Sequence, residues 1–255
     1  MSAADNVISL AKKYIGYLGK YSNKDLYSFK ANANGKYNMF AYELDSLGDW
    51  YNGKKNGYDW CDVFVDWLMY KSFGEDMALK VLYQPHKSLG AGVKYSAQYY
   101  KDNKAFFDKP KPGDQIFFGD KKSGTWYHTG IVTEVTSTYV NTVEGNASAK
   151  FDDKKYASAV AAFRYPLTYS TIVGYGRPNY TVVKDDGEKE PEQVDNGYDG
   201  RVTATVLNVR SGPSTKYKVV KQLKYAMVVH IQEEADGWGK IGDAQWVCLQ
   251  YIKKV

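Results

Sequence analysis

Apolar residues follow a helical period in the first part of the chain and a two-residue period further on. Residues 3–17 place Val7, Leu10, Ala11, Tyr14 and Ile15 on one face, and this spacing predicts a helix. A second helix is predicted over residues 60–70, where apolar positions recur every three to four residues and Gly74 can end the helix. The intervening residues 21–59, rich in Gly, Asn and Tyr, predict a loop region.

Alternation of apolar and polar positions begins after residue 114 and predicts strands at 115–118, 128–135 and 139–146. Helices followed by strands predict an α+β domain in which N-terminal helices pack on an antiparallel sheet. From residue 200 onward the pattern predicts a small all-β domain. Its expected strands are 202–206, 217–223, 227–233, 238–241 and 245–249.

The charge distribution separates the two predicted domains. Residues 1–178 carry a net charge of +5, residues 179–198 carry −4, and residues 199–255 carry +4. The acidic stretch consists mainly of charged and turn-forming residues, which bury too little apolar surface to stabilise an ordered structure. We therefore expect domains at 1–178 and 199–255, joined by an acidic flexible linker at 179–198.

Composition excludes several classes of protein. The chain has 44% hydrophobic and 25% charged residues, as in soluble globular proteins, and lacks the apolar run of a membrane span. Its two cysteines form neither a disulfide framework nor a zinc motif, and its three histidines form no H-E-x-x-H metalloprotease motif. The basic domains would attract polyanions, either nucleic acid or an anionic bacterial wall, but no nucleic-acid-binding motif is present. The 24 tyrosines supply flat amphipathic surface suited to stacking on sugars or filling β-cores.

Two residues are candidates for chemistry. Cys61 lies where a loop becomes a helix, and the free N–H groups of a helix start favour a thiolate there; a buried structural cysteine is the alternative. His128 is the candidate base. If Val135 pairs with Tyr139 in a hairpin, His128 shares one face with Glu144 and Asn146, and Glu144 lies diagonal to it, where a carboxylate can orient the imidazole.

Four short motifs, in this order, resemble the CHAP domain (cysteine, histidine-dependent amidohydrolase/peptidase), a papain-like fold of peptidoglycan hydrolases. They are Trp60-Cys61-x-x-Phe64-Val65-x-Trp67, Pro112-Gly-Asp-x-x-Phe117-Phe118, His128-x-Gly-Ile-Val132 and Glu144-x-Asn146. The resemblance spans roughly residues 5–178. It implies Cys61 as nucleophile, His128 as general base, Glu144 as the group that orients His128, and Asn146 as an auxiliary polar residue.

The residues just before Cys61 add two further expectations. Tyr58 or Asp59 is a further candidate to line the cleft. Some CHAP domains bind calcium through an Asp-x-Asp loop in this stretch, but here Lys54 and Lys55 are poor neighbours for a calcium ion. We therefore expect no metal ion and no cofactor.

The C-terminal residues resemble a bacterial SH3 (SH3b) domain, an SH3-like barrel that holds enzymes on the cell wall. The resemblance rests chiefly on Leu207-Asn-Val-Arg-Ser-Gly-Pro and also on Gly237-Trp-Gly-Lys-Ile241, Trp246-Val247 and Tyr251-Ile252. We expect Trp238 and Trp246 to be mostly core, and His230 and Cys248 to be structural.

Together the two resemblances imply an enzyme that hydrolyses an amide bond in Gram-positive peptidoglycan, as an N-acetylmuramoyl-L-alanine amidase or a peptide endopeptidase. Because the chain starts without a secretory signal, we expect a phage endolysin, held in the host cytoplasm until a holin pore releases it to the wall. The alternatives are a bacterial autolysin of the same chemistry whose signal has been removed, and a non-catalytic wall-binding protein. We expect a monomer whose partner is peptidoglycan, with no nucleic acid and no membrane as a partner.

Overall fold

The computed structural model describes residues 2–183, 197–242 and 244–255. The chain divides into two compact units, Met1–Asp185 and Asp186–Val255. Within the described residues, no helix is both long enough and apolar enough to cross a membrane.

The first helix of the N-terminal unit, α1 (Ala3–Lys13), is shorter than the sequence predicts. Ser2 and Asp5 cap its start by exchanging hydrogen bonds, and the helix ends four residues before residue 17. Gly16 explains the early end, because its φ of +92° is left-handed and turns the chain toward the sheet, where its N–H donates to Val160. Ile15 therefore lies exposed rather than on the buried face.

The central helix α3 (Cys61–Phe73) confirms the second predicted helix, although it starts one residue later and ends three residues later, just before Gly74. Nine of its residues are buried, including every position from Cys61 to Met69, so neighbouring elements enclose it. Three further helices were not predicted: α2 (Met39–Asp45), α4 (Glu75–Leu82) and α5 (Val93–Asp102). The first of them lies within the segment predicted as loop, because its seven residues are too few to show a period.

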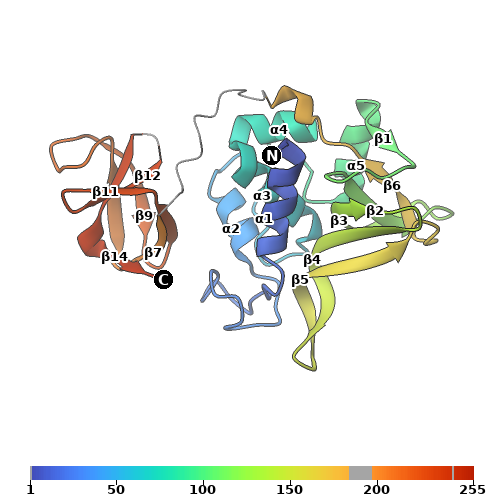
Figure 1. The fold of residues 1–255 in the computed structure, drawn as a ribbon, viewed down its shortest axis with the longest axis horizontal. Helices are drawn as coiled ribbons and strands as arrows, with labels where there is room; N and C mark the ends of the chain where they lie inside the picture. The colour runs from blue at the N-terminus through green and yellow to red at the C-terminus, as the bar shows by residue number, and fades with distance from the viewer. Residues whose placement is uncertain (1, 184–196, 243) are drawn as a thin grey trace. The chain divides into compact units, whose positions relative to one another are not determined.

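A six-stranded antiparallel sheet forms the second layer of this unit, with strand order β1-β6-β2-β3-β4-β5. Its strands are β1 (Phe106–Phe107), β2 (Gln115–Asp120), β3 (Thr125–Val135), β4 (Tyr139–Phe151), β5 (Lys154–Pro166) and β6 (Ile172–Gly176). Helices α1, α3 and α5 contact β3, so the helical layer packs on the central strands, and the layers can be followed in Figure 1. The predicted α+β class is confirmed.

The β3–β4 hairpin has a different register at its tip from the one expected. Val135 pairs with Val140 rather than Tyr139. A bulge between Val132 and Glu134 then shifts the pairing by one residue, so that Ile131 lies opposite Val143. This pairing agrees with the expected register, which is why the predicted face of the hairpin forms despite the error at its tip.

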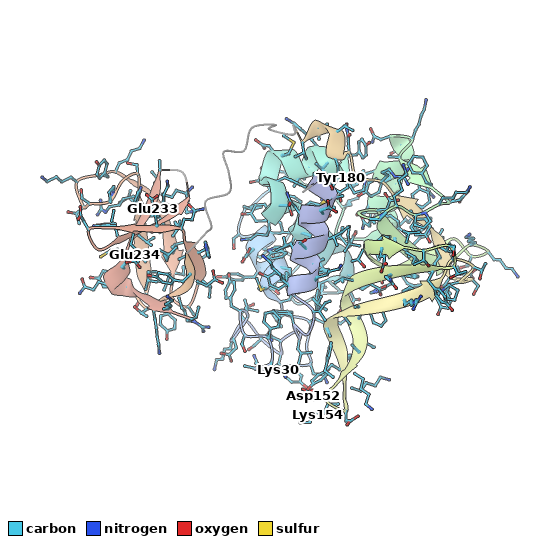
Figure 2. The ribbon with its side chains drawn as sticks, viewed as in Figure 1. Lys30, Asp152, Lys154, Tyr180, Glu233 and Glu234 are labelled. Atoms are coloured by element: carbon cyan, nitrogen blue, oxygen red, sulfur yellow. The ribbon has the colours of Figure 1, made fainter. Side chains whose placement is uncertain are left out.

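The long β4–β5 hairpin reaches back to the N-terminal loops at its tip. Figure 2 shows Lys30 beside Asp152 there, and the two side chains form an ion pair at 3.2 Å. Both side chains are exposed, so the pair adds little to stability.

The first residues assigned to the linker, 179–183, belong to the folded first unit. They form a short 3-10 helix, η1 (Tyr180–Val182), whose Tyr180 is labelled in Figure 2. The Tyr180 hydroxyl donates to the carbonyl of Gly113 at 2.8 Å, and the N–H of Asn179 donates to Val81. Residues 184–196 of the expected flexible linker lie outside the described residues.

The C-terminal unit is all-β, as predicted. Its sheets have the orders β10-β7-β14 and β11-β12-β13-β8-β9. The strands are β7 (Tyr198–Val202), β8 (Val206–Arg210), β9 (Val219–Lys224), β10 (Val228–Ile231), β11 (Glu233–Ala235), β12 (Trp238–Gly242), β13 (Gln245–Cys248) and β14 (Ile252–Lys254). A 3-10 turn, η2 (Leu249–Tyr251), precedes the last strand. Figure 2 labels Glu233 and Glu234, which lie exposed on β11.

Two details of this unit differ from expectation. A strand at 202–206 was predicted, but β7 ends at Val202 and β8 starts at Val206, so this segment is the turn between two strands. Its Val and Thr residues are typical of strands, but the chain leaves one sheet and enters the other there. The buried core contains Val202, Leu207, Val209, Leu223, Ile231 and Val247. Trp238 and Trp246 are only half-buried and lie outside that core.

Candidate active site

Cys61 is the first residue of α3 and lies against a cavity. Trp60 precedes it and provides no side-chain cap, so the N–H groups of the first helical turn are left for another acceptor. Cys61 is buried, with its thiol on a cavity of about 430 Å³. The cavity is lined by Asp59, Cys61, Phe118, Tyr127, His128, Glu144, Asn146, Ala147, Ser148, Phe163, Tyr165, Tyr169 and Thr171. The structure thus brings all four predicted site residues to one cavity.

A histidine–carboxylate pair lies on the sheet side of this cavity. His128 Nε2 is 2.9 Å from Glu144 Oε2, and the two side chains are 20% and 2% exposed. The backbone at Gly130 makes room for this pair, because a Cβ there would lie 2.4 Å from Cγ of Glu144. The diagonal placement expected from the hairpin register is therefore the one that the strands adopt.

Glu144 is itself held by two hydroxyl groups. Thr142 Oγ1 donates to Glu144 Oε1 at 2.6 Å, and the Tyr165 hydroxyl donates to Glu144 Oε2 at 3.3 Å. Burial of the carboxylate without such partners would be unfavourable. The two donors fix the carboxylate plane, and through it the orientation of the His128 ring.

The electrostatic setting favours a charged imidazole. Burial by itself lowers the pKa of His128, but hydrogen bonds to Cys61 and Glu144, together with their negative charges, outweigh burial and raise that pKa to about 10. Since Nε2 faces Glu144, the other ring nitrogen, Nδ1, is the one available to the thiol of Cys61. The arrangement can therefore hold a proton between a sulfur atom and a carboxylate.

A buried polar network connects the neighbours of these two residues. Gln115 Nε2, on β2, donates to Asp62 Oδ1 at 2.7 Å and to Thr129 Oγ1 at 3.0 Å. Ser96 donates to the other oxygen of Asp62 at 2.6 Å. Burial, and then the nearby charge of Asp66, raise the pKa of Asp62 well above its usual range. Because Asp62 follows Cys61 and Thr129 follows His128, this network joins the helix start to the sheet.

Asn146 lies at the rim of the cavity and bonds to residues other than His128. Its Nδ2 donates to Asp59 at 2.9 Å, and its Oδ1 accepts from Ser158 at 2.9 Å. Asp59 also forms an ion pair with Lys36 at 2.9 Å. Of the two residues weighed as cleft-lining, Asp59 lines the cavity, whereas Tyr58 is not among its lining residues and is exposed.

Sequence reasoning missed several residues of this site. Thr142 had a usable signal, since it alternates with Glu144 along a predicted strand. Tyr165, Phe163 and Tyr169 had none, because β5 and the turn after it were not predicted. Gln115 occupies an unspecified position of a recognised motif, so the motif alone did not single it out.

One group of side chains among the described residues has the composition of a metal site, and it is not part of the cavity. Asp49, Glu75 and His86 place one ligand atom each within 4.8 Å of one another. These residues are partly or fully exposed, and such groups are common on surfaces without an ion.

A thiol at a helix start beside a buried imidazole–carboxylate pair is the arrangement of cysteine-dependent hydrolases. Residues 53–146 match the CHAP domain family, and residues 205–251 match the bacterial SH3 domain family. The chain therefore carries a CHAP domain followed by a bacterial SH3 domain, the organisation of a CHAP-type peptidoglycan hydrolase.

The solved structures that resemble this chain include two crystal structures of Ly7917. One is 14% identical, covers 97% of this chain and 92% of that chain, and has a TM-score of 0.32. The other, of Ly7917 with the hydrolyzing product of MDP, is 15% identical, covers 98% of this chain and 97% of that chain, and has a TM-score of 0.31. No curated protein matches the chain.

Proposed function

We propose that this chain cleaves an amide bond of peptidoglycan, with Cys61 as nucleophile, His128 as general acid and base, and Glu144 as the residue that orients His128. Asn146 is proposed as an auxiliary residue that shapes the rim. One observation carries the proposal: Cys61 and the His128–Glu144 pair, at 2.9 Å, line the same cavity. The raised pKa of His128, about 10, means that the ring carries a proton to deliver at neutral pH.

In the first half of the reaction, the sulfur of Cys61 attacks the amide carbonyl carbon and forms a carbon–sulfur bond. The carbonyl oxygen becomes an oxyanion, which the N–H groups at the start of α3 are placed to stabilise. The carbon–nitrogen bond then breaks, and the proton of His128 goes to the departing amine. This step leaves a thioester on Cys61 and a neutral imidazole.

In the second half, His128 accepts a proton from a water molecule as that water attacks the thioester. The carbon–sulfur bond breaks and releases a carboxylic acid, which loses its proton to solvent, and the thiolate of Cys61 and the charged His128 are restored. Glu144 keeps the ring in one tautomer and orientation throughout, because Thr142 and Tyr165 hold its carboxylate.

We propose that the SH3 domain binds the cell wall and thereby raises the local concentration of substrate for the CHAP domain. Two modules on one chain gain affinity in this way without any new contact between them. The CHAP domain must reach peptidoglycan that is fixed in an insoluble wall, and binding by the SH3 domain would keep it there. We therefore expect loss of the second unit to slow lysis of whole cells more than hydrolysis of soluble fragments.

The proposed biological setting is that of a phage endolysin released to the wall through a holin pore. A bacterial autolysin would use the same residues. Neighbouring genes separate the two, since a holin gene beside this one belongs to a phage lysis cassette.

The test replaces Cys61 by Ala and measures release of soluble fragments from purified Gram-positive peptidoglycan. We expect hydrolysis to fall by about 10⁴-fold or more, because the nucleophile of a covalent mechanism has no substitute. Cys248→Ala, the matched control in the other unit, should retain hydrolysis.

The same variants distinguish the two classes of function. Cys61→Ala should still bind sedimented cell walls, because the second unit is unchanged. If wild-type protein binds walls of several hosts and releases no fragment from any, the protein is a non-catalytic wall-binding protein and the proposed mechanism is wrong.

A further inference from the structure

The cavity beside Cys61 contains a row of aromatic rings. The rings of Phe163 and Tyr165 are stacked, with centroids 6.0 Å apart and planes 24° apart. Tyr169 continues the row, 5.1 Å from Tyr165, and Phe118 lies 5.0 Å from Tyr165. Tyr169 is 43% exposed, so the row ends in an open ring, and Tyr127, 55% exposed, lines the same cavity.

The charges of this cavity restrict what the aromatic row can bind. Its lining residues include two carboxylates, Asp59 and Glu144, and among those in the described part of the chain only His128 can carry a positive charge. A stem peptide carries carboxylates that would find no lysine or arginine among these lining residues, and Lys36, which lies beside Asp59, is already paired with it at 2.9 Å. An uncharged sugar, by contrast, presents C–H faces that pack on aromatic rings and hydroxyl groups that tolerate nearby carboxylates.

We infer that the row formed by Phe163, Tyr165 and Tyr169 is a glycan subsite, which holds the N-acetylmuramic acid residue that bears the scissile amide. The inference rests on the proposed function and specifies its substrate. Tyr165 connects the two parts of the site, because its ring lies in the row and its hydroxyl bonds to Glu144. A sugar on the row is thus next to the residue that orients His128.

This placement decides which bond is cut. Because the row and Cys61 line the same cavity and the lactyl group of muramic acid is short, a sugar on the row places the amide to L-alanine at Cys61. Sulfur then bonds to the lactyl carbonyl carbon, the bond to the L-alanine nitrogen breaks, and the His128 proton goes to that amine. The stem peptide therefore leaves at this step with a free N-terminal L-alanine. Water then cleaves the muramoyl thioester, giving one proton to His128 and leaving a lactyl carboxylic acid that loses its proton to solvent.

The test measures binding to the inactive Cys61→Ala protein by titration calorimetry. The probes are a disaccharide-pentapeptide of N-acetylglucosamine and N-acetylmuramic acid, and the same pentapeptide without sugar. We expect Cys61→Ala to bind the first probe at least about 10-fold more tightly than the second, because only the first reaches the aromatic row.

Variants of the open end of the row sharpen this test. In the Cys61→Ala background, Tyr169→Ala should weaken binding of the disaccharide-pentapeptide by about 5- to 10-fold, and Tyr169→Phe should leave it nearly unchanged. Tyr127→Ala is a second variant of the same cavity and should also weaken it. Tyr95→Ala is the matched control, since Tyr95 is 45% exposed but lies on α5, outside the cavity residues.

Two results would overturn the inference. One is equal affinity for the two probes, and the other is equal binding by the Tyr169→Ala and Tyr95→Ala variants. Analysis of the products from active protein separates this failure from failure of the proposed function. New peptide ends within the bridge or stem would refute the glycan subsite and retain the cysteine mechanism, whereas fragment release that persists in Cys61→Ala would refute the mechanism itself.

Discussion

Each of the two units contains a histidine paired with a carboxylate, and the two pairs have similar nitrogen–oxygen distances. In the CHAP unit, His128 Nε2 lies 2.9 Å from Glu144; in the SH3 unit, His230 Nδ1 lies 2.7 Å from Asp199. The surroundings differ. His128 and Glu144 are 20% and 2% exposed, whereas His230 and Asp199 are 42% and 59% exposed.

The comparison shows that a short distance between a base and a carboxylate does not by itself make a catalytic site. His230 and Asp199 are direct cross-strand partners on β10 and β7, where an exposed ion pair contributes at most about 1 kcal/mol. His128 and Glu144 face a cavity, exclude most water, and have a thiol as third partner. Burial strengthens the interaction of His128 with Glu144, and Cys61 is the nucleophile whose reaction needs the proton carried by His128.

The largest expected difference between the pairs is in activity. His128→Ala should reduce peptidoglycan hydrolysis by about 10⁴-fold or more, because no other group can protonate the leaving amine. His230→Ala should leave hydrolysis of soluble fragments unchanged. The measurement is fragment release per unit of folded protein, with circular dichroism as the check on folding, and a large loss of rate in His230→Ala would contradict the comparison.

Removing the charge of the carboxylate should have a smaller effect. Glu144→Gln keeps a hydrogen-bond acceptor for His128 but loses the negative charge, so we expect the rate to fall by about 10²-fold. Asp199→Asn, the matched change in the exposed pair, should have no effect on the rate. If Glu144→Gln and Asp199→Asn lowered the rate equally, the loss of rate would not depend on the position of the carboxylate beside His128.

The same variant should change the pH dependence. The pKa of His128 is raised to about 10 in the folded protein, above the ordinary value of 6.5. The stabilisation from the charged ring is therefore complete below pH 6.5 and is lost as the pH rises through about 10. Activity should fall over the same alkaline range. In Glu144→Gln the alkaline loss of stability and the alkaline loss of activity should both move to lower pH. If either transition stays where it is in the wild type, that transition belongs to the titration of another group.

Much of the site was accessible from the sequence because its residues lie in continuous motifs. Cys61 shares its motif with an apolar helix, and His128 and Glu144 lie on strands joined by a short turn. In a hairpin, the residues that lie opposite each other can be found by counting from the turn. The predicted pairing at the tip was wrong by one residue, and the β-bulge near Val132 restores the predicted pairing beyond it. The α+β class was accessible for the same reason, since the period changes once along the chain.

The remaining parts of the site depend on contacts between residues distant in sequence. Tyr165 reaches Glu144 from β5, 21 residues away, and no period marks that strand as a partner. Gln115 lies 53 residues from Asp62, to which it bonds. Short helices such as α2 were also missed, since tertiary packing rather than local pattern stabilises seven residues as a helix.

The smallest expected effect comes from the hydroxyl that supports Glu144. Tyr165→Phe removes one hydrogen bond to the carboxylate and keeps the ring in the aromatic row, so we expect kcat to fall by about 2- to 10-fold with KM nearly unchanged. Tyr175→Phe is the control, because Tyr175 is a buried tyrosine whose hydroxyl has no hydrogen-bond partner among the described residues. A purely structural role of Tyr165 would lower stability and leave kcat per folded molecule intact. A rise in KM instead would mean that the hydroxyl contacts the substrate rather than positioning Glu144, and Thr142 would then be the main support of the carboxylate.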